Sequence, residues 1–550
     1  MASSKSTSLY FLGGYYMKLT FIGACHEVTG SCFLLQHDGL NILIDSGMKQ
    51  GTSDLASAPL PINEWEIDYI FLTHAHIDHS GNVPYLYKNG FRGKVICTTG
   101  TKELCDIMLK DSAYIQMSDA AWINKHNERS GKEKIEPLYT IEDVEGVLKR
   151  FEAYDYQDII SISDSVSIVF QDAGHLLGSA SIVVMLGTKD NYTSIVFSGD
   201  IGNENQPLIK NPTNILSHVD YVVMESTYGN RIHEKPEDYV GLLASIIQKT
   251  FDRGGDLIIP SFAVGRAQEL LYFIREIKER NLIKDHDNFK VYLDSPLANE
   301  ATEIYDKRAL SYCNSETAAL IEQGINPIIF DGLVRTTSVL DSKAIQANEN
   351  PKIIISAAGM CDAGRIRHHL KHNLWRSECT VMFVGYQAVG TLGRIILDGA
   401  TKVKIFGEEI KVSAEIIQFP GISAHADSNG LVKWISALSV KPDKVFVVHG
   451  DDECATSFCH RLIDECGLDA VAPYSGSEFN LLTDEFEHIA GPERISITSH
   501  SGNSFSKSFS KLLDAYENLG EVVNMYEYGA NKDIEKFSMQ ISDLAQRWDD

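Results

Sequence analysis

Short apolar runs separated by polar turns fill the first 228 residues of the chain. Residues 18–23, 31–36 and 41–45 alternate with glycine-containing turns and predict the strands of a β-meander. Continuous apolar runs at 68–74 and 94–99 predict buried strands, and a helix over 101–116 should follow the second. Further strands are predicted at 166–175, 180–186, 194–200 and 221–227. In this part of the chain, polar residues collect where strands end.

From residue 229 onward the apolar runs are more widely spaced and alternate with helical patterns. Buried-strand patterns occur at 255–262, 290–296, 351–360 and 379–386, and 263–281 is an amphipathic helix. Strands that alternate with helices are typical of a parallel sheet. Two more strands are predicted within 415–427 and 444–450. The polar residues 120–158 are expected to be helical.

Length and composition limit the class of protein. The chain has 550 residues, 44% of them hydrophobic, which is too long for one core and predicts two or three domains. No run of eighteen apolar residues occurs, so we expect no membrane-spanning helix and no membrane partner. Residues 1–16 lack the regions of a signal peptide and are expected to be a leader or a disordered extension.

The charge balance and the cysteines bear on partners and location. Acidic residues outnumber basic ones, 75 to 49, for a formal net charge of −26. Such a surface does not attract polyanions non-specifically, so nucleic-acid binding requires a local site. The ten cysteines include no CxxC pair and lie mostly in apolar segments. They are expected to be reduced core residues, which indicates a cytoplasmic protein.

One short stretch, "FLTHAHIDHS" at 71–80, carries unusual chemistry. It places His74, His76, Asp78 and His79 directly after a predicted strand. Neutral imidazoles and a carboxylate are ligands suited to Zn²⁺. Alternation brings His74 and His76 to one side of the loop, while Asp78 and His79 turn to another. One loop can therefore contribute ligands to two adjacent metals.

The remaining ligands of a two-metal site should also follow strands. His175, Asp200 and His449 each end a predicted strand. They complete two ligand sets: His74, His76 and His175 on one metal, and Asp78, His79 and His449 on the other, with Asp200 bridging. Asp45, in "ILIDSG", is expected to orient the histidine loop without touching a metal.

These segments resemble a known family. "ILIDSG", "THAHIDH", "GHLLGSAS" and "SGD" are similar to the metallo-β-lactamase fold, an α/β protein built as an αββα sandwich. "MESTYG", "PSFAVGRAQELLYFI", "SAAGMCDAGRIRHHL", "VGYQAVGTLGR" and "GISAHAD" follow in the order of its β-CASP subfamily of RNA-processing nucleases. The resemblance covers about 17–480 and implies a β-CASP domain, a parallel α/β sheet, inserted into the sandwich.

The resemblance also implies roles for particular residues. The acid of the family's motif A falls on Glu225, and the histidines of motifs B and C fall on His425 and His449. A motif C histidine is typical of members that act on RNA. We therefore expect two Zn²⁺ ions and catalysis by Asp78, Glu225 and His425. His425 should protonate the leaving 3′ oxygen, and the products should carry a 5′-phosphate and a 3′-hydroxyl.

The expected function is that of an endoribonuclease on single-stranded RNA, and an additional 5′-exonuclease activity is left open. Three arginines are candidate phosphate contacts: Arg266, Arg365 and Arg367. The alternatives are a DNA nuclease, a small-molecule metallo-hydrolase of the same fold, and an inactive scaffold subunit. The oligomeric state is open, with a homodimer as one alternative.

The motif order predicts a split domain. Residues 17–228 and 415–482 should form the metallo-β-lactamase domain, and residues 229–414 the inserted β-CASP domain. Residues 483–550 are expected to be a C-terminal helical tail.

Overall fold

The computed structural model describes residues 16–51, 55, 57–188, 191–215, 217–234, 236, 238–421, 423–493 and 537–542. Residues up to Pro492 belong to one unit, and only Glu493 and a helical segment at 537–542 are described from the second. The expected leader, apart from Tyr16, and most of the expected tail lie outside the described residues.

Two mixed sheets form the first half of the fold. The eight-stranded sheet has the order β23-β22-β1-β2-β3-β4-β5-β6. Its strands are β1 (Met17–Gly23), β2 (Cys32–His37), β3 (Leu40–Ile44), β4 (Tyr69–Phe71), β5 (Lys94–Thr98), β6 (Phe151–Tyr154), β22 (Glu478–Asn480) and β23 (Glu485–His488). The strands β1 to β3 pair antiparallel, so the predicted meander is confirmed.

The seven-stranded sheet has the order β21-β20-β11-β10-β9-β8-β7. Its strands are β7 (Ile159–Ser161), β8 (Val166–Asp172), β9 (Ala180–Thr188), β10 (Asn191–Phe197), β11 (Tyr221–Glu225), β20 (Lys444–Val448) and β21 (Ala470–Val471). Because β10, β11 and β20 run parallel, their carboxyl ends meet at one edge. The chain returns to this sheet at β20 after an excursion of more than 200 residues.

Apolar side chains from the two sheets pack face to face. Phe21 of β1 contacts Phe446 of β20 at a ring-centroid distance of 5.0 Å, and Phe33 faces Phe197 at 6.0 Å. Both rings of the first pair are fully buried. Burial of apolar surface on this scale is the main force that holds the sheets together.

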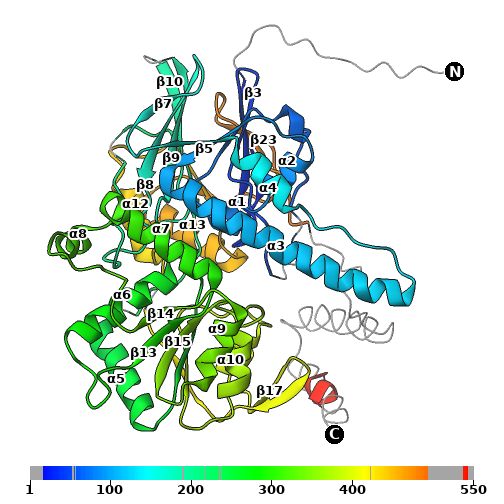
Figure 1. The fold of residues 1–550 in the computed structure, drawn as a ribbon. Coiled ribbons are helices and arrows are strands. Elements are labelled where there is room, and N and C mark those ends of the chain that lie inside the picture. Colours follow the sequence, from blue (N-terminus) through cyan, green and yellow to red (C-terminus); the bar gives the residue numbers. More distant parts are fainter. Residues whose placement is uncertain are drawn as a thin grey trace. The chain divides into compact units, whose positions relative to one another are not determined.

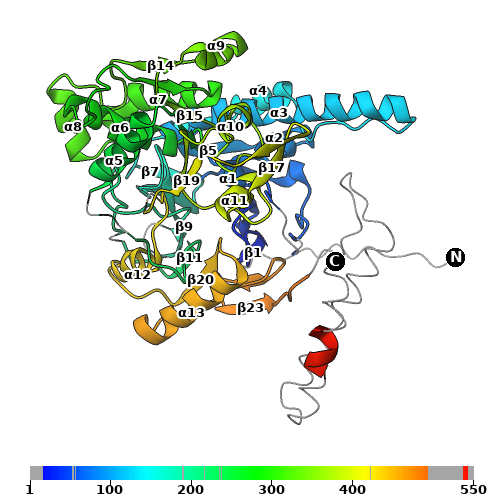
Figure 2. The same cartoon turned by 90° about the horizontal axis from the view of Figure 1, so that it is seen from below.

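Helices cover the outer faces of this pair of sheets. The first sheet carries α2 (Val83–Lys88), α3 (Thr99–Ser130) and α4 (Ile141–Leu148), which bury Leu104 and Val144 against it. The second carries α12 (Ser428–Ser436) and α13 (Asp452–Cys466), as Figure 2 shows beside β20. The predicted αββα sandwich is therefore confirmed.

A third sheet of parallel strands has the order β14-β13-β15-β12-β16-β19. Its strands are β12 (Leu257–Pro260), β13 (Lys290–Leu293), β14 (Leu333–Arg335), β15 (Lys352–Ser356), β16 (Thr380–Phe383) and β19 (Glu415–Gln418). The helices α5 (Tyr239–Asp252) and α6 (Arg266–Glu279) pack on one face and α10 (Ile366–Asn373) on the other (Figure 1). The short helix α11 (Leu392–Leu397) packs on the same face as α10. The remaining elements are η1 (Glu64–Glu66), α1 (Ile77–Ser80), α7 (Pro296–Tyr312), α8 (Ser315–Glu322), α9 (Val339–Ala344), η2 (Ile345–Ala347), β17 (Lys402–Ile405) and β18 (Glu408–Lys411).

The structure differs from the sequence prediction in four details. The helix expected over 101–116 continues to Ser130, where Gly131 adopts φ +66° and ends it. The segment 120–158, expected to be helical, also contains the strand β6. The expected helical tail begins instead with the strand β23, which pairs with β22. The boundary expected at 414/415 falls inside the third sheet, since β19 pairs with β16.

Two negative expectations can also be compared with the structure. Among the described residues, no helix combines the length and apolar character needed to cross a membrane. All ten cysteines are described as free thiols, eight buried and two partly buried, as expected for reduced core residues.

Candidate metal centre

The histidine loop is positioned by the strand that precedes it. The strand β4 ends at Phe71, and the chain then runs through Thr73 into the short helix α1. Asp45 follows the neighbouring strand β3 and accepts hydrogen bonds from the Thr73 backbone N–H at 2.8 Å and from Thr73 Oγ1 at 2.7 Å. His79 Nδ1 also contacts Asp45, at 2.8 Å. These contacts connect the Asp45 carboxylate to both Thr73 and His79 of the loop.

One group of side chains converges around His76. His76 Nδ1 lies 3.0 Å from His74 Nε2 and 3.1 Å from His175 Nε2. The Asp200 Oδ2 oxygen lies 3.4 Å from both His74 Nε2 and His175 Nε2. Four ligand atoms thus surround a single point. His175 comes from the loop after β8 and Asp200 from the loop after β10.

A second group uses the other oxygen of Asp200. Asp200 Oδ1 lies 3.2 Å from His79 Nε2, which lies 3.2 Å from His449 Nε2. The Asp78 Oδ2 oxygen lies 3.6 Å from His449 Nε2. His449 directly follows β20, so this group joins residues more than 350 positions apart in the chain.

The donor set fits divalent metal ions. A tetrahedral zinc with bonds of about 2.0–2.1 Å separates its ligand atoms by roughly 3.3–3.4 Å, and the observed separations cluster near that value. Asp200 Oδ1 is buried and accepts no hydrogen bond from the described residues. A buried carboxylate oxygen without a donor is costly unless a cation compensates it. The Asp200 carboxylate therefore presents one oxygen to each group of candidate ligands, Oδ2 to His74 and His175 and Oδ1 to His79.

Burial gives several of these histidines the protonation state of a metal ligand. Burial, together with His74, lowers the pKa of His76 to about 3, and burial likewise lowers the pKa of His74 and of His175. Neutral imidazoles with free nitrogen lone pairs result. His79 behaves differently, because Asp200 and Asp45 outweigh its burial and raise its pKa.

His425 and Glu225 form a pair beside the two groups. His425 Nδ1 lies 3.2 Å from Glu225 Oε1, while His425 Nε2 faces Asp200 Oδ2 at 3.9 Å. Glu225 is itself held by the backbone N–H of Ile201 at 2.6 Å and of Thr227 at 3.2 Å. Burial lowers the pKa of His425, but the Glu225 carboxylate, helped by Asp200, outweighs it and raises that pKa to about 9. His425 retains about a fifth of its side-chain exposure, so it faces the open side of the site.

Two threonines contact the histidines from outside the predicted set. Thr73 Oγ1 lies 3.1 Å from His74 Nδ1, and Thr227 Oγ1 lies 3.1 Å from His449 Nδ1. Each contact leaves the Nε2 atom of the ring free to face the cluster. Each threonine lies within one of the family motifs, "THAHIDH" or "MESTYG", but nothing in the sequence singles out its hydroxyl.

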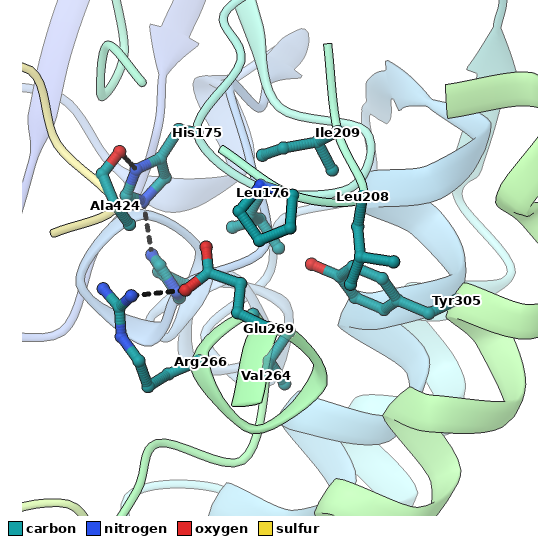
Figure 3. Close-up of a pocket in the computed structure, with 12 residues that line it drawn as sticks. His175, Leu176, Leu208, Ile209, Val264, Arg266, Glu269, Tyr305 and Ala424 are labelled. Atoms are coloured by element: carbon teal, nitrogen blue, oxygen red, sulfur yellow. Dashed lines mark hydrogen bonds and ion pairs between the residues drawn. The ribbon is translucent and has the colours of Figure 1, made fainter. Parts of the chain in front are cut away.

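The three candidate arginines lie in different places. Arg266 begins α6, is 9% exposed and pairs with Glu269. Figure 3 shows this pair opposite His175, across a cavity of about 50 Å³ that His76 also lines. Arg365 lines a neighbouring cavity of about 520 Å³ that also reaches His76. Arg367 points elsewhere and packs over the Phe406 ring at 4.7 Å.

Comparison with family profiles assigns three consecutive regions. The metallo-beta-lactamase superfamily profile matches residues 27–218, and the Beta-Casp domain profile matches residues 267–396. A third profile, described as a Zn-dependent metallo-hydrolase RNA specificity domain, matches residues 409–473. The last region includes His425 and His449.

Curated relatives align over most of the chain. Ribonuclease TTHA0252 of Thermus thermophilus is 34% identical over 438 residues, which cover 80% of this chain and 94% of that protein. Transcription termination factor FttA of Methanosarcina mazei is 32% identical over 471 residues, 83% of this chain and 70% of that protein. An RNase J-like protein of Methanocaldococcus jannaschii is 29% identical over 461 residues, 84% of this chain and 98% of that protein.

Proposed function

This chain belongs to the β-CASP family of the metallo-β-lactamase superfamily, and from that premise we propose that it is a zinc-dependent ribonuclease. Its substrate is single-stranded RNA, and it cleaves internal phosphodiester bonds to leave a 5′-phosphate and a 3′-hydroxyl. The observation that carries the proposal is the buried Asp200 carboxylate, which faces two sets of ligand atoms at metal-binding separations.

The proposed metal ligands divide into the two observed groups. His74, His76 and His175 hold one zinc ion, and Asp78, His79 and His449 hold the other, with Asp200 shared between them. When bound, such ions polarise the phosphate and make a nucleophile available from water at neutral pH. Asp45 fixes the His79 ring through Nδ1, so that Nε2 points into the cluster.

The proposed proton donor is His425. Cleavage that leaves a 3′-hydroxyl requires a proton on the departing oxygen, and imidazolium is the usual group that supplies one near neutral pH. The contact with Glu225 supports this role, because it holds Nδ1 and favours the protonated imidazole, which leaves Nε2, 3.9 Å from Asp200 Oδ2, to carry the proton that is donated. Glu225 therefore serves as the positioning residue for His425.

RNA is favoured over the alternative substrates by two observations. The profile named for RNA specificity matches the region that contains His425 and His449. Two of the curated relatives described above are named as ribonucleases or as RNase J-like. A small-molecule hydrolase would not need the separate six-stranded sheet that stands beside the site. An inactive scaffold would be expected to have lost ligands, whereas all seven are present here.

We propose further that the β-CASP domain is inserted into the metallo-β-lactamase domain between β11 and β20. The parallel pairing of β11 with β20 supports this division. The third sheet starts at β12 and includes β19, which favours a boundary after Gln418 rather than at 414/415. The protein is proposed to be cytoplasmic, and a homodimer is the assembly to test by light scattering after gel filtration.

The decisive experiment compares RNA substrates with free and joined ends. Purified full-length protein with zinc is incubated with a linear end-labelled RNA, a circular RNA of the same sequence, and the matching single-stranded DNA. Cleavage of both RNAs, abolished by a chelator and giving 5′-phosphate ends, is the expected result. Cleavage of the linear RNA alone would establish exonuclease action instead, and preferential cleavage of DNA would refute the assignment.

A further inference from the structure

A cavity of about 520 Å³ opens directly beside the proposed metal cluster, with His76 at one end. Three of its walls come from the loops after β12, β13 and β15 of the third sheet, and a fourth comes from α3. These three strands are parallel neighbours, so their carboxyl ends meet at one edge. Ligands of open α/β sheets bind in the crevice at such an edge.

The lining of this cavity is largely apolar, yet several of its side chains are exposed. Phe262, in the loop after β12, is 48% exposed. Tyr114 and Ile115 of α3 line the same cavity at 65% and 47% exposure. Aromatic rings with free faces in a cleft are stacking surfaces for unpaired nucleobases, whatever the base.

The backbone beside Phe262 leaves room for its ring. A Cβ atom on Gly359 would lie 3.2 Å from the Phe262 nitrogen and 3.3 Å from two atoms of its ring. The glycine therefore allows the loops after β12 and β15 to approach closely behind the ring. Phe262 is therefore packed from one side, while nearly half of its surface is exposed and part of it lines the cavity.

A fixed arginine stands on the same wall. Arg365 Nη1 donates to Asp294 Oδ1 at 2.7 Å, and Nη2 donates to the Thr337 carbonyl at 2.8 Å. Asp294 is fully buried and also accepts from His369, Thr336 and Ser342. These contacts orient the guanidinium but occupy only two of its five N–H donors. The others are available to a phosphate oxygen.

Carboxylates also line this cavity, and they limit where a phosphate can sit. Asp294 is already surrounded by four donors, but Asp111 and Asp119 stand on the α3 side. A phosphate is therefore favoured near Arg365, whereas a base is favoured near Phe262 and Tyr114.

The other large cavity near the site has a different character. It measures about 600 Å³, and its lining has four carboxylates against two cations, Lys210 and Arg266, a balance that disfavours RNA phosphates. The carboxylates belong to Glu204, Glu269, Glu276 and Glu316. Its rings Tyr272 and Phe273 are buried and offer little stacking surface. Its Arg266 and Glu269 also line the narrow cavity of about 50 Å³ in Figure 3, together with His76.

We propose that the 520 Å³ cavity is a nucleotide subsite. It receives one unpaired nucleotide next to the scissile phosphate, with the base stacked on Phe262 and a phosphate on Arg365. The inference rests on the proposed function and refines it. The enzyme binds an unstacked base beside the bond that it cleaves, and any of the four bases can occupy the subsite.

A double-perturbation experiment tests the stacking contact. A single-stranded RNA whose cleavage position has been mapped is compared with versions that carry one abasic ribose at each position in turn. At one position within about two nucleotides of the cleaved bond, the abasic site should lower kcat/KM by about 5- to 150-fold. Phe262→Ala should lower kcat/KM on intact RNA by a similar factor but cause no further loss on that abasic RNA. Phe262→Trp should retain activity.

A matched variant controls for the loss of any exposed phenylalanine. Phe406 is 46% exposed and lies on the β17–β18 hairpin, outside this cavity. Phe406→Ala should leave the abasic profile unchanged. The proposed subsite is contradicted if the effects of Phe262→Ala and of the abasic site on kcat/KM multiply at every position. It is also contradicted if no abasic position lowers kcat/KM. Either result still requires RNA cleavage, so it is distinct from failure of the proposed function, in which no RNA would be cut.

The phosphate contact has its own test. A methylphosphonate, which lacks the charge, is placed at each linkage flanking the sensitive nucleotide. Arg365→Gln should lower kcat/KM on normal RNA but not on the RNA with the methylphosphonate at the contacted linkage. Arg280→Gln, at an exposed arginine that pairs with Glu276 and does not line this cavity, should behave like the parent on all these RNAs. If Arg365→Gln lowers kcat/KM on every methylphosphonate RNA as much as on normal RNA, Arg365 does not contact a phosphate in this subsite.

Discussion

At the scale of single residues, Asp200 links the two halves of the site. Its two oxygens face different sets of histidines, and one of them has no hydrogen-bond donor among the described residues. By contrast, the Glu225 carboxylate accepts from two backbone N–H groups and faces a single imidazole. The first arrangement suits bridging of cations, and the second suits orientation of a proton donor. The different donors around the two carboxylates are therefore consistent with the separate roles proposed for Asp200 and Glu225.

Replacement of His425 should separate chemistry from metal binding. His425→Ala should lower RNA cleavage by roughly 10²–10⁴-fold, the range for a positioned general acid, with zinc content unchanged. An RNA with a better leaving group at the scissile position should recover part of the lost rate, because it no longer needs the proton. The measurements are single-turnover cleavage and zinc analysis of the same sample.

The control for this prediction is His79→Ala. His79 is 2% exposed and contacts both Asp45 and Asp200, so its loss should reduce zinc content as well as activity. Parent-level cleavage by His425→Ala would contradict the proton-donor role and leave the metal site standing.

The candidate metal ligands could be predicted where their spacing in the sequence is distinctive. The crowded "HAHIDH" loop and the lone polar residues after strands were enough to place His175, Asp200 and His449 with it. The orienting hydroxyls of Thr73 and Thr227 were not predictable, because a threonine has no distinctive pattern and its contact depends on tertiary structure. The different surroundings of Arg365 and Arg367 also could not be predicted, because the two residues are only two positions apart in the sequence. Arg365 lines a cavity, whereas Arg367 packs on the Phe406 ring.

At the scale of elements, close backbone approach fixes the histidine loop. The loop after β3 passes so near α1 that a Cβ on Gly47 would lie 1.6 Å from the Asp78 carbonyl oxygen. The Gly47 nitrogen also donates to the Ser31 carbonyl at 2.9 Å, which ties this loop to the residue just before the strand β2. There is no space for even a methyl group between the two segments.

Gly47→Ala should therefore displace Asp78 and His79 without unfolding the chain. A shift of about 1 Å in a catalytic group costs on the order of 10²-fold in rate, so cleavage should fall by about that factor, with a reduced zinc content. Gly491→Ala is the matched control, since nothing lies within 4 Å of a Cβ at that position. Cleavage assays, zinc analysis and circular dichroism make the comparison. Full activity in Gly47→Ala would mean that the loops can separate at little cost.

Element type was predictable and element length was not. The three strands of the meander and the alternating strands and helices after residue 255 follow directly from hydrophobic spacing. The long helix α3 runs fourteen residues past its expected end, because its second half is polar and exposed and carries little periodic signal. The strand β23 lies at the sheet edge, where exposed residues also obscure the pattern.

At the scale of the whole molecule, the metal cluster joins chain segments that are far apart. His449 follows β20, whereas His79, whose Nε2 it contacts, lies in α1 near the start of the chain. The strands of the third sheet lie between them in the sequence. Bound metal stabilises the folded chain over the unfolded one by RT ln(1 + [L]/Kd), about 4 kcal/mol at a free concentration of 1,000 Kd.

Protein purified without chelator should therefore contain about two zinc atoms per chain. Chelation should lower its Tm, and added Zn²⁺ should restore it. Elemental analysis and thermal unfolding of the same preparation provide the measurement. A zinc content near zero, with no change of Tm on addition of Zn²⁺, would rule out the two-metal site.

The pH dependence of stability should reveal a buried acid outside the metal cluster. Asp172 ends β8, is 8% exposed and accepts a hydrogen bond from the Gly174 N–H at 2.9 Å. Burial raises its pKa to about 7, against an unfolded value near 3.8. Because the folded state holds this proton more tightly, stability falls as pH rises from about 4 to about 7, by up to about 4 kcal/mol.

Asp172→Asn should remove this loss while keeping an oxygen that accepts from Gly174. The variant should unfold at a higher temperature than the parent at pH 8, and at nearly the same temperature at pH 5, where Asp172 is protonated in the folded parent. Tm is measured from pH 5 to pH 8.5 with chelator present, so that metal binding does not contribute to the trend. Asp164→Asn, at an exposed aspartate just before β8, should give a Tm difference that does not grow with pH. If the Tm difference between Asp172→Asn and the parent is also independent of pH, Asp172 is ionised throughout this range. Its burial then makes no pH-dependent contribution to stability.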